Sequence, residues 1–211
     1  MNHDLYKAYY EYLAKLVLET ILPAHFKNMS LQDKPDLINF DGKGVEVTRA
    51  LFEGDGERTG RFRKVKNKEE HKIDKKDLIR LDQLHSHILF MQGKAAGLVP
   101  PAQWCTLAEA EKAFTDKLQK INNYNSIFAL FIYAPTFNWY ELEMIEDFTQ
   151  WAANTQKTTK AGFSEVYIFE YTTLYMCHLL TGSVEKIELD KETIHSCCEK
   201  ALAFANRKLL L

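Results

Sequence analysis

The chain has 211 residues, of which 46% are hydrophobic and 27% charged, and its formal net charge is −2. This balance is typical of an ordinary globular protein with a sizeable core, most simply one domain, and the small net charge favours no class of partner. No apolar run is long enough to cross a membrane and no secretion leader is visible, so we expect a cytoplasmic location without membrane contact.

The first predicted element is a helix from Leu5 to Leu22. Its apolar positions recur at helical spacing and form one stripe: Tyr9, Leu13, Leu16 and Val17. Glu11 lies opposite that stripe and Glu19 flanks it near the helix end, so both are expected to be solvated surface residues. The tyrosines of this helix could stack nucleic-acid bases, but their spacing favours core and interface positions, which leaves a homodimer open.

Residues 34–51 predict two short strands joined by a tight turn, because apolar and β-branched runs flank a glycine-rich turn signal. A three-residue loop followed by a glycine bulge would pair Ile38 with Glu46 and Asp36 with Thr48. Since side chains alternate between the faces of a strand, Asp36, Glu46 and Thr48 would then share one face. A two-residue loop would separate the two carboxylates, so their meeting depends on an odd-numbered loop.

Two carboxylates on one face repel each other, and a bound cation is the simplest way to hold them together. Mg²⁺, or Mn²⁺ in its place, suits carboxylate oxygens with water and phosphate, and the main-chain carbonyl of Val47 could complete the set. Asp36 and Glu46 are therefore candidate metal ligands. In the alternative, Asp36 only opens the first strand after Pro35, and Glu46 points to solvent from an edge strand.

Residues 57–80 concentrate positive charge, with ten Lys or Arg against five acids. Such a segment could follow a nucleic-acid backbone, and the candidate contacts are Arg58, Arg61, Arg63, Lys64, Lys66 and Lys68. Acids interleave with lysines at helical pair spacing, so a solvated helix face is the alternative. We expect a loop from Gly54 to Gly60, a long helix from Lys66 to Gln92 ending near Gly93, and a connector from Ala95 to Trp104.

A helix is predicted from Thr106 to Tyr124, opening with a capping box formed by Thr106 and Glu109. Its inward stripe consists of Phe114, Leu118, Ile121 and Tyr124. Lys117 lies inside this stripe, whereas Lys120 falls off its edge. A lysine on an inward face must either extend out to solvent or meet a carboxylate, and the pair at Asp36 and Glu46 could supply one.

The remaining elements complete an α/β pattern. Residues 126–134 are apolar throughout, as in a strand that helices cover on both faces. A helix at 138–153, a strand at 165–171, a hairpin of 174–179 with 184–189, and a closing helix at 191–207 follow. The sequence therefore predicts a mixed β-sheet flanked by helices, in one domain spanning residues 1–211 with a basic helical insertion at 54–105. The four cysteines are expected to stay reduced.

The hairpin resembles the PD-(D/E)XK nuclease-like superfamily, in which Pro-Asp opens one strand and an acidic-x-Lys triplet lies on the next. Pro35-Asp36 and Glu46-Val47-Thr48 stand in those places, and the run through Arg49 is similar to a bacterial branch whose triplet ends in Thr. The resemblance implies a restriction-endonuclease-like α/β sandwich and Mg²⁺-dependent hydrolysis of DNA or RNA, as an endo- or exonuclease. It also implies a third strand in the first meander, which no segment between Glu46 and Ser126 predicts.

Thr48 departs from the superfamily pattern, because a hydroxyl cannot replace the positive charge of the triplet lysine. The resemblance then implies either a relocated lysine, for which Lys117 is the candidate, or a catalytically inactive protein that binds nucleic acid or a protein partner. The superfamily often adds an acidic residue from the first helix. Glu11 and Glu19 are the candidates for that role.

Overall fold

The computed structural model describes residues 3–51, 54–99, 107–121, 127–134 and 140–208. The chain divides into two compact units. The main unit comprises Met1–Ala50 and Thr106–Leu211, and the inserted unit comprises Leu51–Cys105. The boundaries of the inserted unit lie close to those expected for the insertion at 54–105.

The main unit is built on a seven-stranded mixed sheet in the order β1-β2-β3-β6-β7-β8-β9. The strands are β1 (Ser30–Leu31), β2 (Leu37–Ile38), β3 (Gly44–Arg49), β6 (Ile127–Tyr133), β7 (Glu165–Glu170), β8 (Thr173–His178) and β9 (Ser183–Glu188). The three central strands, β3, β6 and β7, are parallel, and all other neighbours are antiparallel. The predicted mixed sheet and its last four strands are thereby confirmed.

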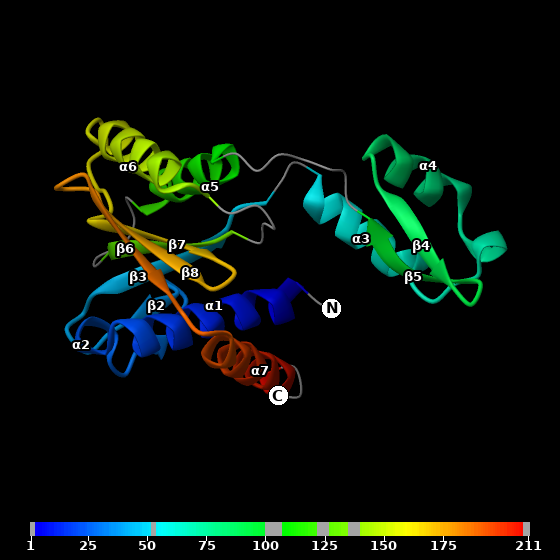
Figure 1. Cartoon of the computed structure of the whole chain (residues 1–211), viewed down its shortest axis with the longest axis horizontal. Helices are drawn as coiled ribbons and strands as arrows, with labels where there is room; N and C mark the ends of the chain where they lie inside the picture. The colour runs from blue at the N-terminus through cyan, green and yellow to red at the C-terminus, as the bar shows by residue number, and fades with distance from the viewer. Residues whose placement is uncertain (1–2, 52–53, 100–106, 122–126, 135–139, 209–211) are drawn as a thin grey trace. The chain divides into compact units, whose positions relative to one another are not determined.

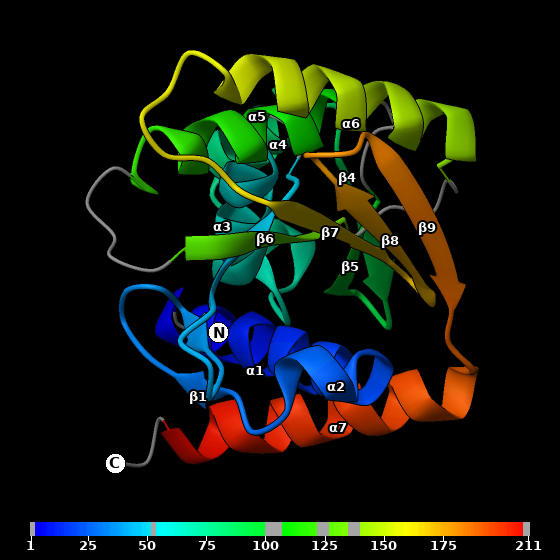
Figure 2. The same cartoon turned by 90° about the vertical axis from the view of Figure 1, so that its left-hand side faces the viewer.

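Helices cover both faces of this sheet. α5 (Ala108–Leu118) and α6 (Leu142–Gln156) lie on one face, and α1 (His3–Ile21), α2 (Pro23–Phe26) and α7 (Lys191–Lys208) lie on the other (Figure 1 and Figure 2). This layering explains why β6 is apolar along its whole length, since both of its faces are covered. The expected capping residue Thr106 and the stripe residue Tyr124 lie outside the described residues.

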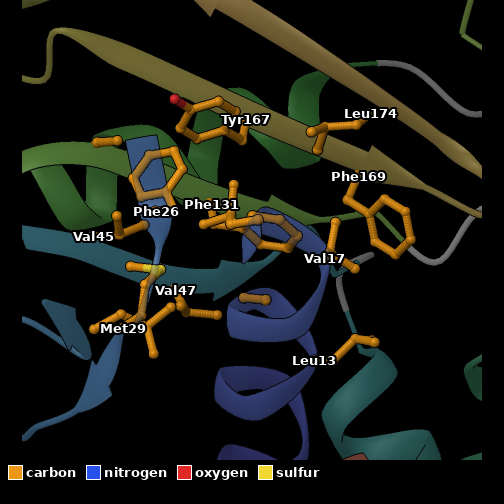
Figure 3. Packing of buried hydrophobic residues seen from close by; sticks show 14 of the residues in the cluster. Leu13, Val17, Phe26, Met29, Val45, Val47, Phe131, Tyr167, Phe169 and Leu174 are labelled. Atoms are coloured by element: carbon orange, nitrogen blue, oxygen red, sulfur yellow. The ribbon is translucent and has the colours of Figure 1, made fainter. Parts of the chain in front are cut away.

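Strand alternation sorts the core into two layers. Val45 and Val47 of β3 pack with Phe131 against the inner side of α1 (Figure 3). On the opposite face, the ring of Phe114 from α5 contacts the rings of Phe148 and Phe163. Because Val45 and Val47 point towards α1, Glu46 between them must point towards α5.

The hairpin of β2 and β3 forms in a register different from the predicted one. Leu37 pairs with Val45 and Ile38 with Gly44, so the connecting loop is residues 39–43. Asn39 closes this longer loop, because its side-chain oxygen accepts from the backbone nitrogen of Lys43 at 2.8 Å. The expected pairing of Ile38 with Glu46 and of Asp36 with Thr48 is therefore wrong by two positions. The loop nevertheless has an odd number of residues, which keeps Asp36 and Glu46 on one face.

The third strand of the meander precedes the two predicted strands. β1 pairs antiparallel with β2, with Ser30 opposite Ile38 and Leu31 opposite Leu37. A strand of two residues carries too few side chains to show an alternating pattern, so nothing in the sequence distinguished it from a loop. The meander is therefore β1-β2-β3, and Asp36 lies in the connection between its first two strands.

The inserted unit is not the predicted long helix. It consists of α3 (Asp55–Val65), a 3₁₀ turn (Glu70–Lys72), α4 (Lys75–Gln83) and a two-stranded sheet of β4 (His87–Met91) and β5 (Lys94–Val99). The loop expected at 54–60, the helix at 66–92 and the connector at 95–104 are thus wrong where residues are described. Gln92 and Gly93 have φ angles of 50° and 73°, and these left-handed conformations turn the chain into a hairpin.

No helix in the described ranges is both long and apolar enough to cross a membrane. Among the cysteines that the structure describes, Cys177, Cys197 and Cys198 are free, as expected.

Candidate functional site

Asp36 and Glu46 meet at the start of the β2–β3 hairpin. Extending the observed register by one position from Leu37 and Val45 places Asp36 opposite Glu46. The Oδ2 atom of Asp36 accepts a hydrogen bond of 2.8 Å from the backbone nitrogen of Val47, which fixes this carboxylate against β3. Both carboxylates are buried. The alternative in which Glu46 faces solvent is therefore excluded.

Lys117 brings a positive charge to this pair from α5. Its Nζ atom lies 3.4 Å from Oδ2 of Asp36 and also forms a close ion pair with Oε2 of Glu46. The side chain is only 20% exposed, so it does not extend out to solvent. Lys120, in the turn directly after α5, is exposed, as its predicted position off the edge of the stripe implies.

The first helix adds a third acid and a second lysine. Glu11 is buried, and the Nζ atom of Lys7 lies 3.3 Å from Oε1 of Glu11 and 3.7 Å from Oδ1 of Asp36. The expectation that Glu11 is a solvated surface residue is wrong. The side of α1 opposite its apolar stripe is covered by the segment that carries Asp36, so burial on this helix extends beyond the stripe.

Burial and mutual repulsion shift the pKa values of this cluster. Burial, with the charge of Asp36, raises the pKa of Glu11 to about 7, although Lys7 opposes the shift. Burial and Asp36 also raise the pKa of Glu46, against the opposing effect of Lys117. For Lys117, burial lowers the pKa but the carboxylates of Asp36 and Glu46 outweigh it, so the net direction is upward. Lys117 therefore stays charged while Glu11 titrates near neutrality.

The structure also places the three other positions that the sequence singled out, Thr48, Val47 and Glu19. Thr48 is half-buried on β3, on the same face as Glu46 by alternation. Val47 is buried in the core, and its backbone nitrogen holds Asp36. Glu19 accepts a 2.7 Å hydrogen bond from the backbone nitrogen of Met29 and pairs with Lys15 at 2.6 Å, so it fastens α1 to the segment after α2.

Arg49, at the end of β3, is a candidate that the sequence reasoning left without a role. Its guanidinium lies over the rings of Tyr10 and Tyr6, at 4.8 Å and 5.6 Å from their centroids. Within the described residues it has no carboxylate partner. The signal was available, because Arg49 directly follows the triplet and alternation turns it towards α1, where both tyrosines lie. A cation held on two rings can contact a phosphate.

The basic residues predicted to contact nucleic acid all lie in the inserted unit. Arg58 is buried and forms an ion pair with Asp55, so its charge is neutralised within the unit. Arg61 lies 2.9 Å from carboxylate oxygens of both Glu57 and Asp77. These two arginines stabilise the inserted unit. The remaining four candidates, Arg63, Lys64, Lys66 and Lys68, are exposed.

The donor atoms at the site resemble those of a magnesium site more than those of a transition-metal site. Within the described residues, no group of three or more His, Cys, Asp or Glu side chains is arranged to hold a metal ion. Mg²⁺, however, is commonly held by one or two carboxylates and keeps several waters. Oε1 of Glu46 is buried without a hydrogen-bond partner in the described part of the chain, so it is a spare acceptor. Asp36, Glu46 and the carbonyl of Val47 therefore fit this ion.

A scan against protein-family models found no match, and searches of curated proteins and of solved structures found none either. What fold and site define together is an α/β protein with a mixed sheet flanked by helices, in which three buried acids are paired with the half-buried Lys117 and the exposed Lys7.

Proposed function

We propose that the main unit is a Mg²⁺-dependent phosphodiesterase with the restriction-endonuclease-like sandwich of the PD-(D/E)XK superfamily. The observation that carries this proposal is the position of Lys117. The chain lacks a lysine in the triplet on β3, yet a lysine from α5 contacts both Asp36 and Glu46. The ammonium group of Lys117 thus supplies, beside the two carboxylates, the positive charge that hydrolysis needs to stabilise negative charge on the phosphate oxygens.

Each group in the cluster has a chemical role in the proposal. Asp36, Glu46 and the carbonyl of Val47 hold Mg²⁺, which supplies Lewis-acid polarisation of a phosphate oxygen and lowers the pKa of a bound water. Lys117 stabilises the negative charge that develops on phosphate oxygens. Glu11 has a pKa of about 7, so it can take or release a proton beside Asp36 in the neutral range. Lys7 balances the charge of Glu11.

Purified protein incubated with plasmid, single-stranded DNA or RNA, with Mg²⁺ or Mn²⁺, tests this function. We expect cleavage whose rate falls by about a hundredfold or more in Asp36→Asn and Glu46→Gln, because in the proposal these side chains hold Mg²⁺ at the reacting phosphate. Lys117→Met is expected to lose activity, whereas Lys120→Met, in the turn directly after the same helix, is expected to keep it. Cleavage that persists in Asp36→Asn at the wild-type rate contradicts the assignment.

One observation favours a second candidate, a nuclease-fold protein without catalysis that binds nucleic acid or a protein. Lys117 forms ion pairs with both carboxylates, so its charge offsets part of their repulsion without a metal ion. This candidate predicts no measurable Mg²⁺ affinity by calorimetry and no cleavage in any of the assays above. Measurable Mg²⁺ binding that disappears in Glu46→Gln excludes it.

A further inference from the structure

A cavity of about 520 Å³ lies within the main unit beside the candidate site. Its walls come from α1, from the segment after β1 and from the end of α7. Leu5 and Leu31 supply apolar surface, Gln32 an amide, and Lys7 and Lys208 positive charge. Its volume is within the range of roughly 300–1,000 Å³ that is characteristic of small-molecule sites, and its walls combine polar and apolar surface in similar amounts.

The cavity and the candidate site share a wall. Lys7 and Glu11 line the cavity, and the Nζ atom of Lys7 lies 3.7 Å from Oδ1 of Asp36. The next wall residue, Gln32, donates from its backbone nitrogen to the carbonyl oxygen of Asp36 at 2.9 Å. A molecule in this cavity therefore has one end against residues that hold Asp36 in place.

The chemistry of the walls fits one nucleotide unit. Apolar side chains suit the faces of a base and a sugar, the amide of Gln32 can donate to or accept from a base edge, and the exposed Lys208 suits phosphate. Two acids also line the cavity. The side chain of Asp33 is 88% exposed, so solvent screens its repulsion of an anion, and the charge of Glu11 is paired with Lys7 at 3.3 Å. An unpaired base fills such a cavity at the lowest cost, because a paired base must first be unpaired and unstacked from its duplex.

We propose that this cavity binds one unpaired nucleotide of the substrate, with Lys208 at its phosphate, so that the substrate is single-stranded nucleic acid. This inference rests on the function proposed above and names the substrate of the same site. The inserted unit has no part in it, since every wall residue belongs to the main unit.

Fluorescence anisotropy tests the inference independently of catalysis. The probes are a short labelled oligothymidylate, alone and in duplex with oligoadenylate, in EDTA so that metal-dependent cleavage cannot occur. We expect tighter binding of the single strand than of the duplex. Lys208→Glu and Gln32→Glu, which place negative charge at the cavity, are each expected to weaken single-strand binding by about fivefold or more.

Two matched controls separate the cavity from general surface charge. Lys200→Glu changes an exposed lysine of the same helix α7, and Ser30→Glu changes an exposed residue two positions before Gln32; neither residue lines the cavity. Both are expected to bind the single strand with wild-type affinity. Equal binding of single strand and duplex, no binding of either, or equal loss in the controls overturns the inference. The proposed function is judged separately, by whether Asp36→Asn abolishes cleavage.

Discussion

Replacing Lys117 with methionine tests whether its ammonium group holds Asp36 and Glu46 together. Methionine keeps most of the apolar stem, so the variant removes charge and little volume. Taking away one partner of a buried ion pair costs about 3–5 kcal/mol when the remaining charge stays buried. The side chain of Lys117 is 20% exposed, and Glu46 can take up a proton, so we expect the lower part of that range or less.

The expected loss is about 2–3 kcal/mol in the free energy of unfolding at about pH 8. For a chain of this size each kcal/mol shifts the melting temperature by about 2–4 °C, so Tm should fall by about 4–12 °C. Lys120→Met is the matched control, because Lys120 is an exposed lysine in the turn directly after the same helix. Its Tm is expected to stay within about 1–2 °C of the wild type, as for other surface substitutions.

The loss should also depend on pH in a defined direction. Without Lys117, the folded-state pKa of Glu46 rises further above its unfolded value, so the folded protein holds a proton that the unfolded chain releases. A raised carboxyl pKa makes stability fall as pH rises from the unfolded pKa towards the folded one. Lys117→Met should therefore approach wild-type stability as pH is lowered to about 5.

The effect of Mg²⁺ on the melting temperature of Lys117→Met is a second test with the same variant. If Asp36 and Glu46 hold Mg²⁺, the ion can replace the missing ammonium charge and raise Tm more in Lys117→Met than in the wild type. Free Mg²⁺ at about ten times its dissociation constant stabilises by about 1.4 kcal/mol, and thermal unfolding with and without the ion measures this. Equal Tm for wild type, Lys117→Met and Lys120→Met at every pH would refute the electrostatic reasoning behind the site.

Two further predictions concern Glu11 and the inserted unit. Because the pKa of Glu11 is raised to about 7, ionising it costs stability as pH rises from about 4.5 to above 7. Glu11→Gln should remove that cost. Its free energy of unfolding relative to wild type, measured by chemical denaturation, should be about 1–2 kcal/mol higher at about pH 8 than at about pH 5. A difference that stays constant with pH contradicts this. Arg58→Met should lose about 1–3 kcal/mol, since it breaks the buried contact with Asp55. In Arg58→Met, hydrogen exchange should show the loss of stability from α3 to β5, whereas the control Lys64→Met should show none. A loss of stability spread evenly over both units contradicts the prediction.

The meeting of Asp36 and Glu46 was predictable although the hairpin register was not. Side chains on a strand repeat every two residues, so a register error of two leaves every side chain on its predicted face. The exact pairing depended on Asn39, whose side chain closes the loop at Lys43 and makes it two residues longer. Nothing in the apolar pattern reports such a contact between a side chain and the backbone.

The inserted unit was not predictable because its pattern fits two structures. Apolar residues such as Leu84, Ile88 and Met91 recur at helical spacing, yet 88–91 is a short continuous apolar run that also suits a strand. The turn at Gln92 and Gly93 decides between them, because both residues take left-handed φ angles. Gln is an unusual residue at the first of these positions, where Asn or Asp is the usual signal.

Lys117 and Glu11 show why one buried charge could be located from the sequence and the other could not. An apolar stripe on α5 surrounds Lys117, so the helix itself forces the lysine towards the core, where only a carboxylate can compensate its charge. Glu11 has no such constraint, because it lies off the stripe of α1 and water would satisfy it. Its burial comes from the segment before β2, which the sequence places nowhere in particular. An acid that is buried by a loop can thus be identified only from the folded structure. A buried lysine such as Lys117 can be located from the sequence, because its charge requires a carboxylate nearby.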